Sequence, residues 1–148
     1  MKELTYPFDS SYILKNKKKI KKTLEDNHYA TEKKIAVLGG STTNDIIKCL
    51  ELFLLNYRIK PIFYVFEYNK FYEDAVFGNM ELDEFNPDII YIHTTYRNIT
   101  NFPQPKDTEE DILSLLNSEY LRFENIWNSL YAKFPNVIII QNNFEMPF

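Results

Sequence analysis

The stretch IAVLGGSTTNDI, Ile35 to Ile46, decides how this chain folds. A short apolar run leads into two glycines, which permit a tight turn. The polar residues that follow are of the types that favour the first positions of a helix: Ser41, Thr42, Thr43 and Asn44. The stretch therefore predicts a buried strand, a sharp turn and the start of a helix.

The rest of the chain repeats this alternation of short apolar runs and amphipathic stretches. We expect strands at Lys34–Leu38, Pro61–Phe66, Pro87–His93 and Asn136–Gln141. We expect helices at Tyr12–Asn27, Thr43–Asn56, Asn69–Phe77 and Thr108–Phe134, and a loop at Asn98–Asp107. Strands that alternate with helices form a parallel sheet through right-handed crossovers. The predicted fold is one α/β domain over residues 1–148, a three-layer α/β/α arrangement around a parallel sheet of about four strands.

Helical spacing indicates which faces should be buried. In the helix at 43–56 the expected buried face is formed by Ile46, Ile47, Leu50, Phe53 and Leu54. In the helix at 108–134 it is formed by Ile112, Leu116, Tyr120, Phe123, Trp127, Leu130 and Phe134. Thr108 can cap the second of these helices, and three acidic residues follow it in the first turn, where they favour the helix dipole.

The last predicted strand has the apolar character of a central strand, yet the chain stops seven residues after Gln141. Doubly wound domains usually add another helix and strand at this edge. We therefore expect either that the chain is an N-terminal fragment of a longer protein or that a partner or a second copy covers the exposed edge, as in a homodimer.

Charge and cysteine content exclude several classes of protein. The net charge of −4 argues against nucleic-acid binding, which needs a basic surface. The basic run Lys15–Lys22 is interpreted as the solvated face of a helix. The single cysteine, Cys49, allows no intrachain disulfide, and no stretch is long and apolar enough for a membrane span, so a cytoplasmic protein is expected.

The GGSTTN turn, Gly39–Asn44, is the strongest candidate for a functional site. Ligands of open α/β sheets bind at the carboxyl ends of the strands, near the point where the strand order reverses. Ser41 could be a nucleophile there, with the N–H groups of the turn stabilising an oxyanion. Ser41 could also lie beside an anion site. On spacing alone the favoured alternative is that Ser41, Thr42 or Thr43 only caps the helix. The turn is neither a Walker A loop nor a GxGxxG motif, and no metal-ligand spacing is present.

A serine nucleophile needs a base, and the chain contains only two histidines. His93 ends the third predicted strand on the correct edge of the sheet, whereas His28 precedes the first strand. His93 is therefore the candidate base, and the alternative is a hydrogen-bonded histidine at the rim of the sheet.

Five segments together resemble a known family: YPFDSSYIL, KKIAVLGGSTTNDI, LELFLLN, PDIIYIHTTYRNI and IIIQNNFEMP. They are similar to the N-terminal region of FkbH-like proteins, which join an SGNH-hydrolase-like domain to a C-terminal haloacid-dehalogenase-type (HAD) phosphatase domain. The resemblance covers nearly all of the chain. It implies a flavodoxin-like SGNH fold and a role in loading or hydrolysing an acyl or glyceryl group, with the HAD domain and an acyl carrier protein as partners.

The resemblance also assigns residues. Ser41 falls at the position of the SGNH serine, although GGS replaces the usual Gly-Asp-Ser. Gly78 could stand for the oxyanion-hole glycine, and Asn98 or Thr95 for the asparagine after the third strand. The Asp-x-x-His motif and the HAD domain have no counterpart here, so this chain alone is expected to be inactive. No cofactor is expected in this chain, since Mg would bind only to the HAD domain. The alternative is a non-catalytic module that binds a carrier protein, a ligand or the HAD domain.

Overall fold

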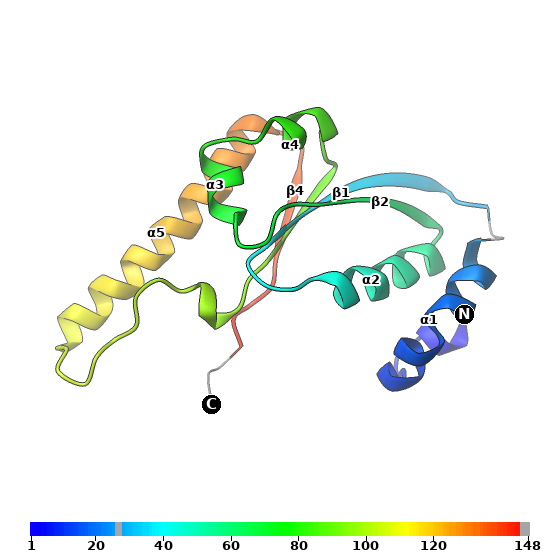
Figure 1. Cartoon of the computed structure of the whole chain (residues 1–148), viewed down its shortest axis with the longest axis horizontal. Coiled ribbons are helices and arrows are strands. Elements are labelled where there is room, and N and C mark those ends of the chain that lie inside the picture. The colour runs from blue at the N-terminus through cyan, green and yellow to red at the C-terminus, as the bar shows by residue number, and fades with distance from the viewer. Residues whose placement is uncertain (26–27, 146–148) are drawn as a thin grey trace.

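The computed structural model describes residues 1–25 and 28–145 and contains a four-stranded, all-parallel sheet flanked by helices (Figure 1). Its strands are β1 (Thr31–Gly39), β2 (Ile59–Val65), β3 (Ile89–His93) and β4 (Ile138–Gln141). The helices are α1 (Ser10–Glu25), α2 (Asn44–Asn56), α3 (Phe71–Val76), α4 (Met80–Phe85) and α5 (Glu109–Lys133), with 3-10 turns η1 (Lys2–Leu4) and η2 (Tyr96–Asn98). This architecture confirms the predicted three-layer α/β/α fold.

The strand order is β2-β1-β3-β4. The chain passes from β1 to β2 on one side and then returns to place β3 on the other side of β1. The order therefore reverses between β1 and β3, where Gly39 is the register partner of His93. In this fold class the crevice at such a reversal is where ligands bind.

Two separate apolar cores hold the helices in place. The larger core joins α3, α4 and α5 to alternate residues of the central strands, including Ala36, Leu38, Ile90 and Ile92, all of which are fully buried. The smaller core joins η1, α1 and α2. Figure 1 shows these two groups of helices at opposite ends of the view, with the strands between them.

The elements differ from the predicted ranges mainly at their ends. Helix α1 begins at Ser10, two residues earlier than expected, because Oδ1 of Asp9 accepts a hydrogen bond of 3.1 Å from the N–H of Tyr12. The predicted end of this helix, at residues 26–27, lies outside the described residues, as do residues 146–148. Strand β1 extends back to Thr31, since its exposed polar first half pairs with β2.

Helix α4 was not predicted from its sequence, MELDEF, which is too short for a helical period to be recognised. Its start is set by Asn79, whose Oδ1 accepts hydrogen bonds from the N–H groups of Glu81 (2.9 Å) and Leu82 (3.3 Å). Asn86 ends the helix in the left-handed region, with φ of 47°.

The predicted buried face of α2 was wrong. The fully buried residues of this helix are Leu52 and Leu55, whereas Ile46 is 37% exposed. The other predicted residues, Ile47, Leu50, Phe53 and Leu54, are half-buried. The physical reason is that α2 packs on α1 as well as on β2, so its most buried side chains point toward the core shared with α1.

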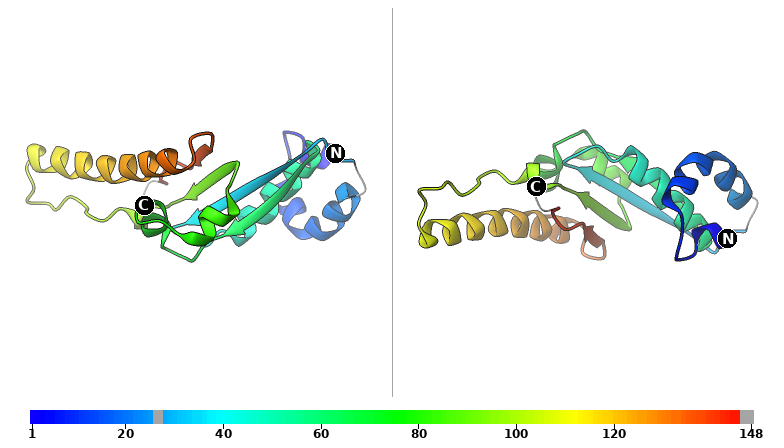
Figure 2. Two further views of the ribbon diagram at one scale, coloured as in Figure 1. Left: turned by 90° about the horizontal axis from the view of Figure 1, so that it is seen from above. Right: turned by 90° about the horizontal axis from the view of Figure 1, so that it is seen from below.

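The buried face of α5 was predicted correctly only in its second half. Phe123 and Leu130 are buried, and Phe134 follows at the C-cap with 8% exposure. Ile112, Leu116 and Tyr120 are exposed, because the N-terminal half of α5 extends beyond the sheet, as both views in Figure 2 show. Thr108 caps the helix as predicted, by accepting a hydrogen bond from the N–H of Asp111.

Within residues 1–25 and 28–145, none of the helices combines the length and the apolar character that crossing a lipid bilayer would require.

Candidate functional site

The Gly39–Asn44 turn lies at the carboxyl edge of the sheet, at the reversal of strand order. Strand β1 ends at Gly39, and the next N–H group, that of Gly40, donates a 2.8 Å hydrogen bond to the carbonyl of His93 at the end of β3. The carbonyl of Gly39 in turn accepts a 2.8 Å hydrogen bond from the N–H of Asn69, which follows β2. The turn is therefore fixed by the two neighbouring strand ends.

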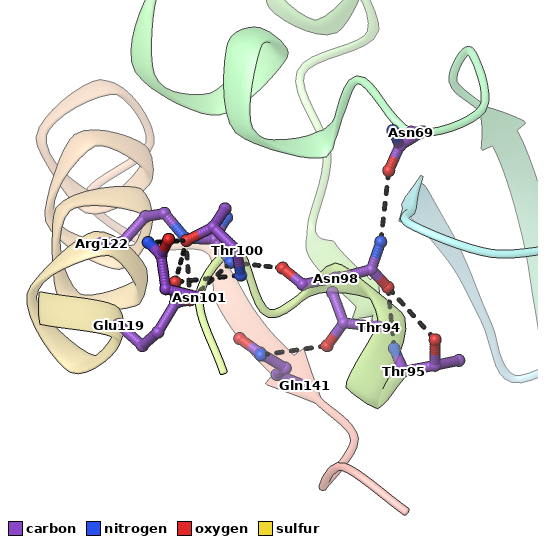
Figure 3. Close-up of polar contacts among 9 residues, drawn as sticks. All are labelled: Asn69, Thr94, Thr95, Asn98, Thr100, Asn101, Glu119, Arg122 and Gln141. Carbon is purple, nitrogen blue, oxygen red and sulfur yellow. Dashed lines mark hydrogen bonds and ion pairs between the residues drawn. The ribbon is translucent and has the colours of Figure 1, made fainter. Parts of the chain in front are cut away.

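The side chain of Asn98 forms a clasp on this turn, made of its hydrogen bonds with Gly40, Asn69 and Thr95; Figure 3 shows those with Asn69 and Thr95. Its Nδ2 donates to the carbonyl of Gly40 at 2.9 Å and to Oδ1 of Asn69 at 3.2 Å. Its Oδ1 accepts from the N–H of Thr95 at 2.8 Å and from the Thr95 hydroxyl at 3.5 Å. Both donors of the amide are thus engaged, and an oxyanion could reach Nδ2 only by replacing Asn69.

A second group of contacts, with α5, holds the backbone of Asn98. Nη2 of Arg122 on α5 donates to the backbone carbonyl of Asn98 at 2.5 Å and to Oε2 of Glu119 at 2.9 Å. Oε1 of Glu119 accepts from the N–H of Thr100 at 3.0 Å and also from the Thr100 hydroxyl. These contacts attach the segment after β3 to the middle of α5 (Figure 3).

Gly40 is required by the close approach of Asn98. A Cβ atom built at Gly40 would lie 2.5 Å from Nδ2 and 2.6 Å from Oδ1 of Asn98, far inside van der Waals contact. At Gly39 the nearest atom is the carbonyl oxygen of Ser41, at 3.0 Å, which is tight but less severe. The absence of a side chain at Gly40 therefore leaves room for the Asn98 amide.

The first turn of α2 is not capped by a side chain. Thr43 is the N-cap residue and is 5% exposed; its carbonyl accepts from the N–H of Ile47 at 2.9 Å, but its hydroxyl makes no cap hydrogen bond. The caps of α4 and α5, by contrast, use the side chains of Asn79 and Thr108. Backbone N–H groups at an uncapped helix start remain available to a negatively charged ligand.

Ser41 and His93 lie at the same edge of the sheet, but no hydrogen bond joins their side chains among the described residues. Ser41 is half-buried at the turn. Nδ1 of His93 lies 3.0 Å from the hydroxyl of Tyr91, two residues earlier on the same face of β3. Burial raises the pKa of Tyr91, which further favours the protonated phenol.

The remaining predicted site residues fall into two groups. Thr42 and Asn44 are exposed at the start of α2, and Thr95 forms the capping box of η2 with Asn98. Gly78 is not among the residues brought to the turn. Its φ of +91° favours glycine, and the nearest atom to an added Cβ is Nζ of Lys133, at the far end of α5.

Sequence reasoning missed Asn69, Glu119 and Arg122, because each reaches the site from an element whose placement depends on tertiary packing. One signal was present in the sequence: asparagine is several-fold enriched over most non-glycine residues at left-handed positions, and the structure gives Asn69 a φ of 61°. An asparagine in the loop that follows a strand is typical of a left-handed turn position, and this could have identified Asn69.

An apolar cavity of about 560 Å³ lies next to the Glu119–Arg122 group, between the N-terminal half of α5 and the chain that leaves β4. Its walls include the side chains of Leu116, Tyr120 and Trp127. The volume is in the range of small-molecule sites, about 300–1,000 Å³. No metal site is found: across residues 1–25 and 28–145, no three His, Cys, Asp or Glu side chains are grouped so that they could hold an ion.

Comparison with known proteins supports the fold. No protein-family model matches the chain, and no curated protein matches it by sequence. A similar solved structure is that of the N-terminal part of the protein BF1531 from Bacteroides fragilis, described as containing a phosphatase domain complexed with Mg. The TM-score is 0.63 at 13% identity, and the match covers 89% of this chain and 34% of that one. The present chain thus spans about a third of its structural neighbour, and the likeness shows the fold alone.

The clasp predicts a specific dependence between two positions. We expect Gly40→Ala to lower the free energy of unfolding by about 1–3 kcal/mol, because the new methyl group displaces the Asn98 amide. In an Asn98→Ala background the same change should have a much smaller effect, since the colliding atoms are gone. Urea unfolding of the four proteins of this cycle measures the difference. If Gly40→Ala lowered the free energy of unfolding equally in both backgrounds, a collision with the Asn98 amide would be ruled out.

The Glu119 contacts predict a dependence of stability on pH. Burial acts to raise the pKa of Glu119, but hydrogen bonds from Thr100 and Arg122 outweigh it and hold the pKa below 4.5. A lowered carboxyl pKa stabilises the fold above the unfolded-state pKa, and this stabilisation is lost as the pH falls through the folded-state value. Glu119→Gln should therefore cost about 1.5–3 kcal/mol at pH 7.

The same variant should show less loss of stability than the wild type between pH 5 and pH 3, measured as urea midpoints. Glu110→Gln, on the exposed first turn of the same helix, serves as the matched control. If the wild type and Glu119→Gln lost stability equally between pH 5 and pH 3, the lowered pKa would not belong to Glu119.

Proposed function

We propose that this chain is the SGNH-like module of an FkbH-like enzyme and that it holds an acyl or glyceryl group at the Gly39–Asn44 turn. In the complete protein a HAD phosphatase domain, with its Mg, would act beside it. In this proposal that metal binds to the HAD domain.

The observation that carries the proposal is the uncapped start of α2 next to the clasped turn. Thr43 leaves the first N–H groups of the helix without a side-chain partner, and the positive end of the helix dipole lies there. The clasp from Asn98 holds the preceding residue, Gly40, in place. A carbonyl or carboxylate oxygen could accept from these amides while Ser41 lies beside it.

In this proposal Ser41 is the acyl acceptor. Its Oγ attacks the carbonyl carbon of an ester or thioester, the C–O or C–S bond to the leaving group breaks, and the Ser41 proton passes to a base. His93 is the candidate base on this edge of the sheet, and Tyr91 orients its ring through Nδ1. Because the two side chains are not hydrogen-bonded to each other, ligand binding must bring Oγ within reach of the imidazole.

Hydrolysis of p-nitrophenyl acetate by the full-length enzyme tests the nucleophile. We expect Ser41→Ala to lower kcat/KM at least tenfold, because the variant lacks the Oγ that attacks the carbonyl carbon in this proposal. Ser118→Ala, an exposed serine on α5, is the control and should leave the rate unchanged. Equal rates for wild type and Ser41→Ala would remove the nucleophile from the proposal.

A second candidate function is a non-catalytic module that binds an acyl carrier protein or its acyl group. It is favoured by the apolar cavity beside α5 and by the lack of a hydrogen bond between the side chains of Ser41 and His93 among the described residues. We expect Leu116→Asp, at the cavity wall, to weaken binding of an acyl carrier protein at least tenfold in calorimetric titration, since it buries a charge. Leu121→Asp is the matched control, because Leu121 is similarly exposed (50% against 66%) but lies outside the cavity. Failure of the wild type to bind would dismiss this candidate.

A further inference from the structure

The two ends of the Asn98 amide are identified by the backbone groups that face them. The N–H of Thr95, which can only donate, lies 2.8 Å from one end, so that end is Oδ1. The carbonyl of Gly40, which can only accept, lies 2.9 Å from the other end, which is therefore Nδ2. Turning the amide over would replace both hydrogen bonds with contacts between like groups. The direction of this side chain is thus set by the segments that follow β1 and β3.

The Asn98 amide in turn decides how the amide of Asn69 is oriented. One N–H of Asn98 Nδ2 donates to Gly40, and the other donates to Oδ1 of Asn69 at 3.2 Å. Figure 3 shows Oδ1 of Asn69 directed toward Asn98. Nδ2 of Asn69 therefore lies on the side of its amide that does not face Asn98. Within residues 1–25 and 28–145 this nitrogen donates no hydrogen bond, and the side chain of Asn69 is exposed.

The backbone of Asn69 holds this amide beside the Gly39–Asn44 turn. Its N–H donates to the carbonyl of Gly39 at 2.8 Å, and its φ of 61° lies in the left-handed region. Glycine adopts that conformation at the lowest cost, and asparagine and aspartate are among the side chains that tolerate it best. Asparagine at this position therefore adds two things that glycine lacks: a hydrogen bond to Asn98 and a donor that faces away from it.

The polarity of these groups indicates which ligand atoms fit the turn. Nδ2 of Asn69 offers N–H groups, and so does the start of α2, where no side chain caps the helix. Such donors match a carbonyl or carboxylate oxygen, and the interaction strengthens as negative charge develops on that oxygen. The amide of Asn98 cannot serve in this way, because both of its N–H groups are already bound.

We propose that Asn69, and not Asn98, supplies the side-chain donor for the carbonyl oxygen of the acyl or glyceryl group at the turn. The inference rests on the proposed function, which supplies the ligand, and it assigns a residue that the family resemblance does not. Nδ2 of Asn69 donates to the carbonyl oxygen, and this hydrogen bond strengthens when attack by Ser41 places negative charge there. A ligand with an ammonium group at this position would meet N–H groups instead of an acceptor and would bind poorly.

Two substitutions distinguish a donor from a residue that only supports the turn. Asn69→Asp keeps the shape of the side chain, tolerates the positive φ and still accepts from Asn98, but it replaces the outward donor with a charged acceptor. Asn69→Gly keeps the backbone conformation but removes the amide and its hydrogen bond to Asn98. If Asn69 is a donor, the aspartate variant is the more damaging of the two. If Asn69 only supports the turn, the glycine variant is.

The experiment is hydrolysis of p-nitrophenyl acetate by the full-length enzyme, with kcat and KM measured separately. We expect kcat to fall at least tenfold in Asn69→Asp and less in Asn69→Gly, where water can replace the amide. KM should change little, because the interaction is strongest in the transition state. Asn117→Asp, at an exposed asparagine on α5, is the matched control and should leave kcat unchanged. Urea unfolding establishes that the variants are folded.

Two results would overturn the assignment and leave the nucleophile in place. The rate could depend on Ser41 but not change in Asn69→Asp, or Asn69→Gly could be the more damaging variant. A rate that does not depend on Ser41 would instead contradict the proposed nucleophile.

In that last case a titration decides whether Asn69 is a donor. Sodium acetate is added to the isotope-labelled chain, and the side-chain NH₂ signals are followed by NMR. The Asn69 signals are identified by their loss in Asn69→Asp. A saturable shift of these signals, with those of Asn117 unchanged, supports the donor, and the absence of a shift overturns it.

Discussion

The hydrogen bonds of the Asn98 side chain are the contact on which the candidate site depends. One amide holds the carbonyl of Gly40, after β1, and the side chain of Asn69, after β2, while its oxygen binds Thr95, after β3. It therefore joins the ends of three adjacent parallel strands. A buried or half-buried amide that uses its donors and acceptors in this way resists movement, because each lost hydrogen bond leaves a polar group without a partner.

The contacts of Asn98 also connect α5 to the turn. Arg122 holds the backbone carbonyl of Asn98, and Glu119 holds both Arg122 and the N–H of Thr100. The middle of α5 thus supports the site, while its N-terminal half extends outward and carries one wall of the apolar cavity. A ligand or partner that changes the packing of α5 would act on the turn through these charged hydrogen bonds, which are stronger than neutral ones.

By itself, the sequence determined the class of fold and the place of the turn. Short apolar runs separated by amphipathic stretches specify parallel strands and crossover helices through local periodicity, and GGSTTN marks a strand-to-helix turn through the conformational freedom of glycine. The capping of α5 by Thr108 followed in the same way, because a cap depends on residues within one turn.

Only the tertiary structure decided which side chains are buried on α2, that Gly40 leaves room for Asn98, and that Asn69, Glu119 and Arg122 support the site. It also decided which strand lies at each edge of the sheet. The contacts of Asn98 with Gly40 and Arg122 join residues 58 and 24 positions apart in the sequence, and the contact of Glu119 with Thr100 joins residues 19 positions apart. No local pattern records such contacts, since they arise from the packing of helices on a sheet whose strand order differs from the order of the chain.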